Sequence, residues 1–298
     1  MGCSGEKGRR ARGGEVHETL SPLESAGVTP TEAPPLVWDS AAGPALILAA
    51  DSVLDSAAVL RPEYVEGRYT GASITGLMAL SRTRFDLFGR GGALGSTTLL
   101  VGQPSVSTGS NDECISWPMV GLSTTAAGWS IGLQTGYAAA VPLDVIEAMS
   151  ASDSALFVAQ VVRLAMLPSS AYDPVFNNIP FVVQHAYRFQ TALVEGIIGV
   201  TRRSIPSEAM PREEHLFFIA ERPVGSSNDY RIAFSTRAAG EEGSTPVVNV
   251  LALVVLNRGE RPAMIVRDEY GDGGAVAVIE RTAPGQWRVI WRSVYAGC

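Results

Sequence analysis

The feature that most constrains the fold is a series of four strand-like segments at the C-terminal end of the chain. They read VVNVLALVVL, RPAMIVRDEY, GAVAVIERT and QWRVIWRSVY, and only short connections separate them. Connections this short join antiparallel neighbours, because a parallel pair needs a crossover of about a dozen residues or more. The run VLALVVL is apolar throughout, which is typical of a strand covered on both faces. The sequence therefore predicts a C-terminal β-meander whose first strand is central.

Further strand-like segments lie in the first half of the chain. Residues 84–88 alternate between polar and apolar side chains and lead into the glycine-rich stretch GRGGALGST, after which residues 97–101 form a second strand-like run. This pattern predicts a β-hairpin. Residues 45–49 also favour a strand.

One segment between these groups has the signals of a helix. Ser152 and Asp153 provide start signals, Pro168 provides a stop, and few polar residues interrupt the stretch between them. A helix that is apolar on most sides packs against another element. We therefore expect an α+β fold, mainly antiparallel β-sheet, with one clear buried helix at about residues 152–167 and the C-terminal β-meander.

The first 35 residues differ in composition from the rest. They are rich in Gly, Pro, Ser, Thr and charged residues, so they cannot bury enough apolar surface to offset the entropy lost on ordering. We expect a disordered tether over residues 1–35 and a β-rich N-terminal lobe over 36–148. A lobe of helix and antiparallel sheet is expected over 149–298, and the two lobes could form one domain.

The charge and hydropathy of the chain exclude some classes of partner. A net charge of −7 opposes nucleic-acid binding, which needs clustered positive charge. No apolar run reaches the roughly 18 residues that a membrane-spanning helix requires, since the stretch 44–60 contains Asp51 and Asp55. Lys7 is the only lysine among 23 basic residues, a bias that indicates a bacterial genome rich in G and C.

The glycine-rich stretch invites comparison with nucleotide-binding loops. A P-loop needs a lysine before its Ser or Thr, but Ser96 follows Gly95 directly. Leu94 occupies the place of the third glycine in a dinucleotide-binding pattern. A hairpin turn is therefore the better interpretation, and no cofactor is predicted.

The chain has three histidines, of which His17 lies in the tether. His185 and His215 lie within or beside strand-like segments, and neither a GxSxG nor an HExxH motif is present. We interpret both as structural or surface residues and assign no catalytic residue and no metal ligand. A hydrolase triad assembled across strands remains an alternative, because spatial neighbours are not visible in a sequence.

Two tryptophans stand out in the last strand. Trp287 and Trp291 are four residues apart, which places both on one face of a regular strand, with Val289 between them. Core packing is the more frequent use of such a stripe. The alternative is a ligand platform, so both are candidate ligand-face aromatics.

Two of the three cysteines fall in the body of the chain. Pairing and position favour a disulfide between Cys114 and Cys298, which would tie the last strand to the region near Cys114. Such a bond contributes about 2–4 kcal/mol and persists only in an oxidising compartment. The alternative is two unrelated buried thiols.

The remaining cysteine lies close to the N-terminus. Gly2, Cys3 and Ser4, followed by a flexible linker, resemble the processing site of bacterial lipoproteins. The resemblance implies lipid attachment at Cys3 and requires a hydrophobic signal segment before it. Met-Gly-Cys also resembles a myristoylated and palmitoylated eukaryotic N-terminus, although Glu6 stands where that pattern has Ser or Thr. In a third interpretation Cys3 is incidental.

A second resemblance covers residues 251–282. The succession of strand, loop and strand resembles the hairpin unit of FG-GAP or VCBS-type repeats in secreted bacterial proteins. Where that pattern has carboxylates, this chain has Val255, Asn257, Gly259 and Ala263, too few oxygen ligands for calcium. The resemblance implies a β-hairpin of an extracytoplasmic protein whose metal site has been lost, and it implies no catalysis.

Together these observations predict an exported, lipid-anchored, non-catalytic protein of the bacterial cell envelope, in the periplasm or at the cell surface. Its expected partners are the membrane, through the anchor, and an envelope protein or a small-molecule ligand. Two alternatives stay open. One is the extracytoplasmic hydrolase, and the other is an intracellular anchored adaptor, in which Cys114 and Cys298 would be reduced.

Overall fold

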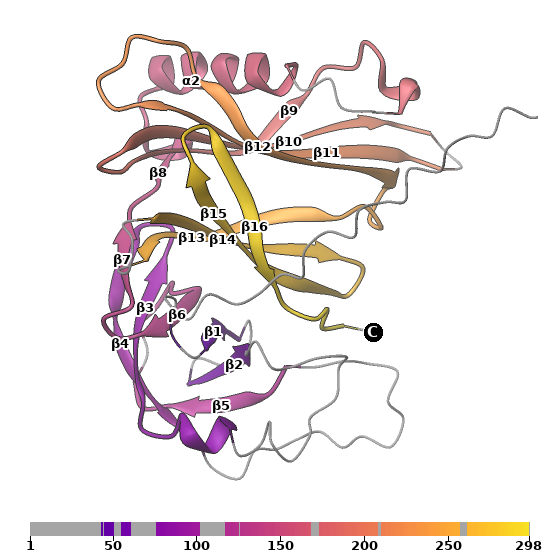
Figure 1. Cartoon of the computed structure of the whole chain (residues 1–298). Helices are drawn as coiled ribbons and strands as arrows, with labels where there is room; N and C mark the ends of the chain where they lie inside the picture. The colour runs from indigo at the N-terminus through magenta and orange to yellow at the C-terminus, as the bar shows by residue number, and fades with distance from the viewer. Residues whose placement is uncertain are drawn as a thin grey trace, which may run out of the picture. The chain divides into compact units, whose positions relative to one another are not determined.

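The computed structural model describes residues 43, 45–50, 55–60, 76–101, 117–124, 126–167, 173–207, 210–256 and 261–297. The chain divides into one unit of Met1–Pro35 and a second of Leu36–Cys298, and every described residue belongs to the second. In that unit a barrel, two five-stranded sheets and a helix are stacked in this order (Figure 1). No helix among the described residues is long and apolar enough to cross a membrane.

The first layer is a closed barrel of six short antiparallel strands. Alternation along each strand gives the barrel two apolar faces. Ile47, Val59 and Phe85 fill the interior, whereas Leu48 and Leu133 point outward and pack on the adjacent sheet. Around the barrel, the strands are β1 (Leu46–Ala49), β2 (Ser56–Leu60), β5 (Met119–Leu122), β4 (Gly92–Leu100), β3 (Arg84–Gly89) and β6 (Ile131–Gln134).

The hairpin predicted around the glycine-rich stretch is confirmed. Strands β3 and β4 pair directly, and only Arg90 and Gly91 connect them. The following Gly92 has φ +115°, a conformation that glycine adopts without the strain other residues would incur. The strand expected at residues 45–49 is also confirmed, as β1.

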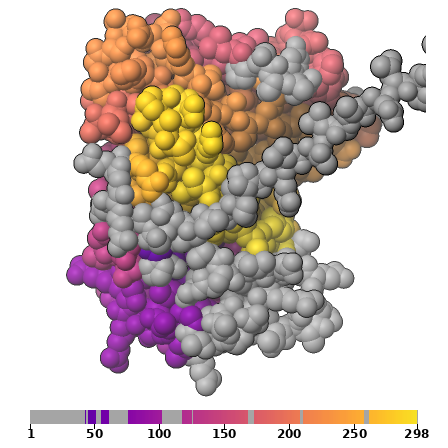
Figure 2. Space-filling model, viewed as in Figure 1, coloured from indigo at the N-terminus to yellow at the C-terminus, as the bar shows by residue number. Residues whose placement is uncertain are grey.

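The second layer, called here the central sheet, contains the predicted C-terminal meander. Its order is β16 (Gln286–Arg292), β15 (Gly273–Ala283), β14 (Arg261–Tyr270), β13 (Val247–Leu256) and β7 (Ala138–Val141). Val254 and Ile265 pack against the barrel, whereas Leu253 and Met264 pack against the third layer. Burial on both faces explains why β13 is apolar throughout. The space-filling view shows the C-terminal strands between the barrel and the outer layers (Figure 2).

The third layer, called here the outer sheet, is also antiparallel. Its order is β12 (Arg231–Glu241), β11 (Arg212–Pro223), β10 (Val194–Ile205), β9 (Val182–Gln190) and β8 (Asp144–Val145). Ile198 and Phe217 face the central sheet, and Ile197 and Phe218 face the helix. Short 3-10 turns at Ile146–Ala148 and Pro174–Phe176 precede and follow the helix in the chain. The predicted α+β fold, dominated by antiparallel sheet, is confirmed.

The fourth layer is the helix α2 (Ala151–Ala165), which lies on the outer sheet as expected. It begins after Ser150, whose hydroxyl accepts a hydrogen bond from the backbone N–H of Asp153, so the cap is two residues earlier than expected. Only a stripe that includes Phe157 and Val161 is buried. The opposite side faces solvent, where Leu156 is 71% exposed. Burial is therefore confined to the side that faces the outer sheet, because only one sheet covers the helix.

Two short strands, β7 and β8, connect the segment 36–148 with the segment 149–298. Strand β7 pairs with β13 in the central sheet, and β8 pairs with β9 in the outer sheet. Both precede residue 148 in the chain, so each five-stranded sheet combines strands from the two segments 36–148 and 149–298.

A buried carboxylate joins the two sheets. Glu221 of β11 is 6% exposed and accepts two hydrogen bonds from Arg281 of β15, each 2.9 Å long. It also accepts one from the backbone N–H of Gly285 at 2.6 Å and one from the indole of Trp287 at 2.8 Å. Burial raises the pKa of Glu221, but these donors outweigh it and the net pKa lies below the ordinary value. The carboxylate therefore stays charged within the interface.

Candidate functional sites

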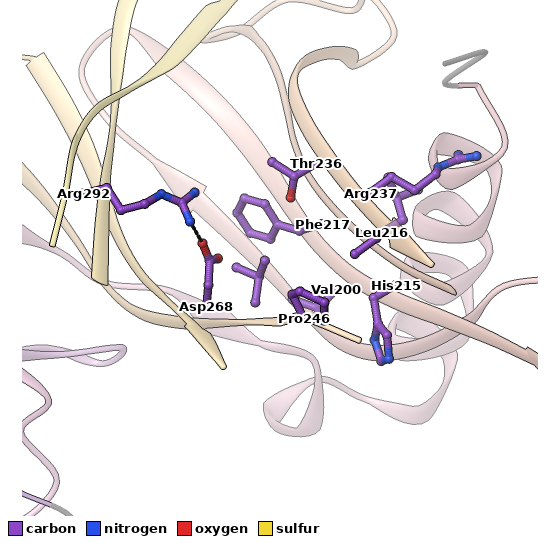
Figure 3. Close-up of a pocket in the computed structure, with 11 residues that line it drawn as sticks. Val200, His215, Leu216, Phe217, Thr236, Arg237, Pro246, Asp268 and Arg292 are labelled. Atoms are coloured by element: carbon purple, nitrogen blue, oxygen red, sulfur yellow. Dashed lines mark hydrogen bonds and ion pairs between the residues drawn. The ribbon is translucent and has the colours of Figure 1, made fainter. Parts of the chain in front are cut away.

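A pocket of about 130 Å³ lies between the central and outer sheets. The Asp268–Arg292 ion pair lies on one side of it and His215 on the other (Figure 3). Two of the residues that line the pocket are open to solvent, since Thr236 of β12 is exposed and the Arg292 side chain is 42% exposed. The lining consists of Val200, His215, Leu216, Phe217, Thr236, Arg237, Ala238, Pro246, Val248, Asp268 and Arg292.

His215 is the unusual residue of this pocket. It is 6% exposed, and neither ring nitrogen makes a hydrogen bond to the described residues. Its Nε2 lies 3.1 Å from Glu213 Oε2, but this ion-pair contact is not aligned as a hydrogen bond. Glu213 is engaged elsewhere, since it accepts a hydrogen bond from the Gly243 backbone N–H at 3.1 Å and lies 3.6 Å from Arg202. A buried imidazole without a hydrogen-bond partner carries a desolvation cost.

This geometry bears on the hydrolase alternative. A triad needs a nucleophile within hydrogen-bond reach of the histidine. The residues that line the His215 pocket include one hydroxyl, that of Thr236, and no serine or cysteine. His185 is exposed on β9 and stacks on Tyr187 with ring centroids 6.4 Å apart. In the part of the chain that the structure describes, neither histidine is paired with a nucleophile.

A larger groove lies on the other face of the outer sheet, beside α2. It measures about 380 Å³. Antiparallel register assembles it, because Asp144 of β8 lies opposite Arg188 of β9, and Glu195 of β10 lies opposite both Gln190 and Arg222. The lining consists of Asp144, Gln160, Arg188, Phe189, Gln190, Glu195, Gly196, Arg222 and Tyr230.

Arg222 and Glu195 form a fixed ion pair in this groove. Arg222 donates to Glu195 through Nε at 2.8 Å, and its Nη2 lies 2.7 Å from the same carboxylate. The hydrogen bond from Arg222, assisted by one from the Gly225 backbone N–H, lowers the pKa of Glu195. The Arg222 guanidinium lies 4.5 Å from the Tyr230 ring centroid, and burial raises the pKa of Tyr230. At neutral pH the pair is ionised and Tyr230 keeps its proton.

Arg188 differs from Arg222 in lacking a carboxylate partner. Its guanidinium lies 4.2 Å from the ring centroid of Phe157, which is fully buried in α2. Within the described ranges it makes no ion pair and no hydrogen bond, although Asp144 is its register partner. Stacking on an aromatic ring holds a guanidinium in place while leaving its N–H groups available to a ligand.

The two tryptophans singled out from the sequence lie on opposite faces of β16. Trp287 belongs to the core between the two sheets, and Trp291 belongs to the core between the central sheet and the barrel. The cause is a bulge, since Val278 pairs with Trp291 while the next residue, Ile279, pairs with Val289. The expected same-face ladder is therefore wrong. The rings are 3% and 4% exposed, so neither offers a surface for a ligand to stack on.

The three cysteines lie outside the described residues. Lipid attachment at Cys3 and a disulfide between Cys114 and Cys298 therefore remain predictions. Among the side chains that the structure does describe, no group of three or more His, Cys, Asp or Glu could hold a metal ion. The chain matches no family model, no curated protein and no solved structure.

Proposed function

We propose that this chain is an exported binding protein of the bacterial cell envelope, anchored through a lipid on Cys3. Its ligand is a small polar carboxylate, held in the groove between α2 and the outer sheet. The observation that supports this function best is the guanidinium of Arg188, which is stacked on Phe157 and lacks a carboxylate partner among the described residues.

The chemistry of the groove favours a carboxylate ligand. A guanidinium presents parallel N–H donors that match the two oxygens of a carboxylate. Arg222 already pairs with the carboxylate of Glu195, so Arg188 is the arginine of the groove whose parallel N–H donors can bind a ligand. The volume of about 380 Å³ is within the range of small-molecule sites, about 300–1,000 Å³.

The remaining polar side chains suggest what else the ligand carries. Gln160 of α2 and Gln190 of β9 offer amide donors and acceptors, and Asp144 offers a carboxylate acceptor. Such groups bind hydroxyls. A small polyhydroxy carboxylate therefore fits the groove better than an apolar acid does.

Calorimetric titration of the full chain tests this site, with gluconate as the probe and sorbitol as the comparison compound that lacks the carboxylate. We expect gluconate to bind and sorbitol to bind at least about tenfold more weakly, the loss expected when a charged group is left unpaired. Arg188→Met should abolish the difference. Arg288→Met removes an arginine exposed on β16, outside the groove, and should leave binding unchanged. Equal affinity of Arg188→Met and the unaltered chain would overturn the proposal, as would failure of gluconate to bind.

Anchoring is tested separately in a bacterial host that expresses the full-length gene. We expect the protein in the membrane fraction, with incorporation of labelled palmitate, and we expect Cys3→Ser to release it and abolish labelling. Retention of Cys3→Ser in the membrane fraction would contradict a lipid at this position. Thiol labelling of the exported, denatured protein without reductant tests the disulfide, because Cys114 and Cys298 should react only after reduction.

A further inference from the structure

The pocket between the two sheets is independent of the groove, since they lie on opposite faces of the outer sheet and share no lining residue. We propose that this pocket is a second binding site, which takes a small neutral aromatic molecule with a hydroxyl group, of the phenol class. The hydroxyl would supply the hydrogen bond that His215 lacks.

The size and walls of the pocket define the body of the ligand. An apolar cavity of about 150 Å³ holds a benzene-sized molecule, and this pocket measures about 130 Å³. Its lining includes the apolar side chains of Val200, Phe217, Pro246 and Val248, so a flat apolar ring is a better match than a polar chain.

His215 defines the polar end of the ligand. An imidazole can accept a hydrogen bond on one nitrogen and donate through the other, and a phenolic hydroxyl can serve either role. Both nitrogens are without such a partner among the described residues. A site that hydrogen-bonds a hydroxyl rejects the analogue lacking it, because the buried polar group is then left unsatisfied.

The charges around the pocket favour a neutral ligand. Asp268 is paired with Arg292, and Glu213 lies beside both Arg202 and His215. Each carboxylate near the pocket therefore already has a cationic or histidine neighbour. A charged ligand would be desolvated without gaining a new opposite charge.

The test is a titration of the full chain with phenol and with benzene, followed by NMR on protein labelled in its histidine rings. Three histidines give a small set of signals, and His215→Leu and His185→Leu assign them. We expect phenol to shift the His215 signals and leave those of exposed His185 unchanged, and to bind about tenfold more tightly than benzene. His215→Leu should lose this preference while still admitting both rings.

If His215→Leu does not fold, the titrations and NMR signals of the unaltered chain still decide the proposal. Equal binding of phenol and benzene would overturn the proposal, as would unchanged His215 signals up to the solubility limit of phenol. A pocket that holds only ordered water, with no response to phenol, would overturn it as well. His215→Gln, which keeps a donor and an acceptor, should retain part of the preference, whereas His185→Leu should retain all of it.

Discussion

Replacing Glu221 with glutamine would test how the two sheets are held together. The substitution keeps the size of the side chain but removes the charge and turns one acceptor oxygen into a donor. At the Oε1 position that donor would face the N–H groups of Arg281 and Gly285, and at the Oε2 position it would face those of Arg281 and Trp287. Arg281 would then lie within the interface, its side chain 11% exposed, without a negative partner at Glu221.

The expected loss follows from the burial of this pair. Removing one partner of a buried ion pair typically costs about 3–5 kcal/mol, because the other charge remains buried and uncompensated. The net pKa of Glu221 is below the ordinary value of 4.5, so the ionised carboxylate stabilises the folded state. This contribution is fully present above the unfolded-state pKa and is lost as the pH falls through the lower folded-state pKa. The difference between the unaltered chain and Glu221→Gln should therefore narrow below about pH 4.5.

Urea denaturation at neutral and acidic pH measures both effects, with intrinsic tryptophan fluorescence as the signal. Glu195→Gln is the matched control, because Glu195 also pairs with an arginine but at a more solvent-accessible site, and its loss should be much smaller. A loss below about 1 kcal/mol for Glu221→Gln, in the range of exposed pairs, would contradict a stabilising buried ion pair between Glu221 and Arg281. The difference in the free energy of unfolding between the unaltered chain and Glu221→Gln should shrink in acid. An increase of this difference in acid would contradict the direction of the pKa shift.

Two further substitutions probe the outer layers. Phe157→Ala removes a fully buried ring between α2 and the outer sheet and should reduce the free energy of unfolding by about 4 kcal/mol in the same assay. Gly196→Ala would place a methyl group inside van der Waals contact with the Phe189 ring and should cost roughly 2 kcal/mol through overpacking. Gly91→Ala, where the added atom has open space, should change stability by no more than about 0.5 kcal/mol. Equal losses for the two glycine variants would contradict the packing argument.

The parts of the fold that the sequence predicts are those with local signals. The meander of β13–β16 follows from short connections, and α2 follows from its start and stop signals. The opposite orientation of Trp287 and Trp291 could not be predicted. A bulge between them reverses the alternation of side chains between the two faces of β16, and no residue type in this stretch indicates the bulge. The closure of six short strands into a barrel depends on pairings between distant segments, such as β1 with β6.

The candidate sites also depend on pairings between distant segments, which the local sequence does not indicate. Arg188 and Arg222 are far apart in sequence and meet because β9, β10 and β11 pair in a particular register. Nothing near either residue distinguishes it from the other arginines of an arginine-rich chain. His215 is flanked by Glu213 and Glu214, a pattern that usually marks an exposed strand end, yet all three are buried. The covering elements that bury them come from elsewhere in the sequence.

A crystal structure of the full chain with gluconate would show whether the groove beside α2 binds a small carboxylate. We expect the gluconate carboxylate on the guanidinium of Arg188, with Arg188 still stacked on Phe157 and the Arg222–Glu195 pair intact. An empty groove in crystals that contain gluconate would contradict the claim, and so would a gluconate molecule bound away from Arg188.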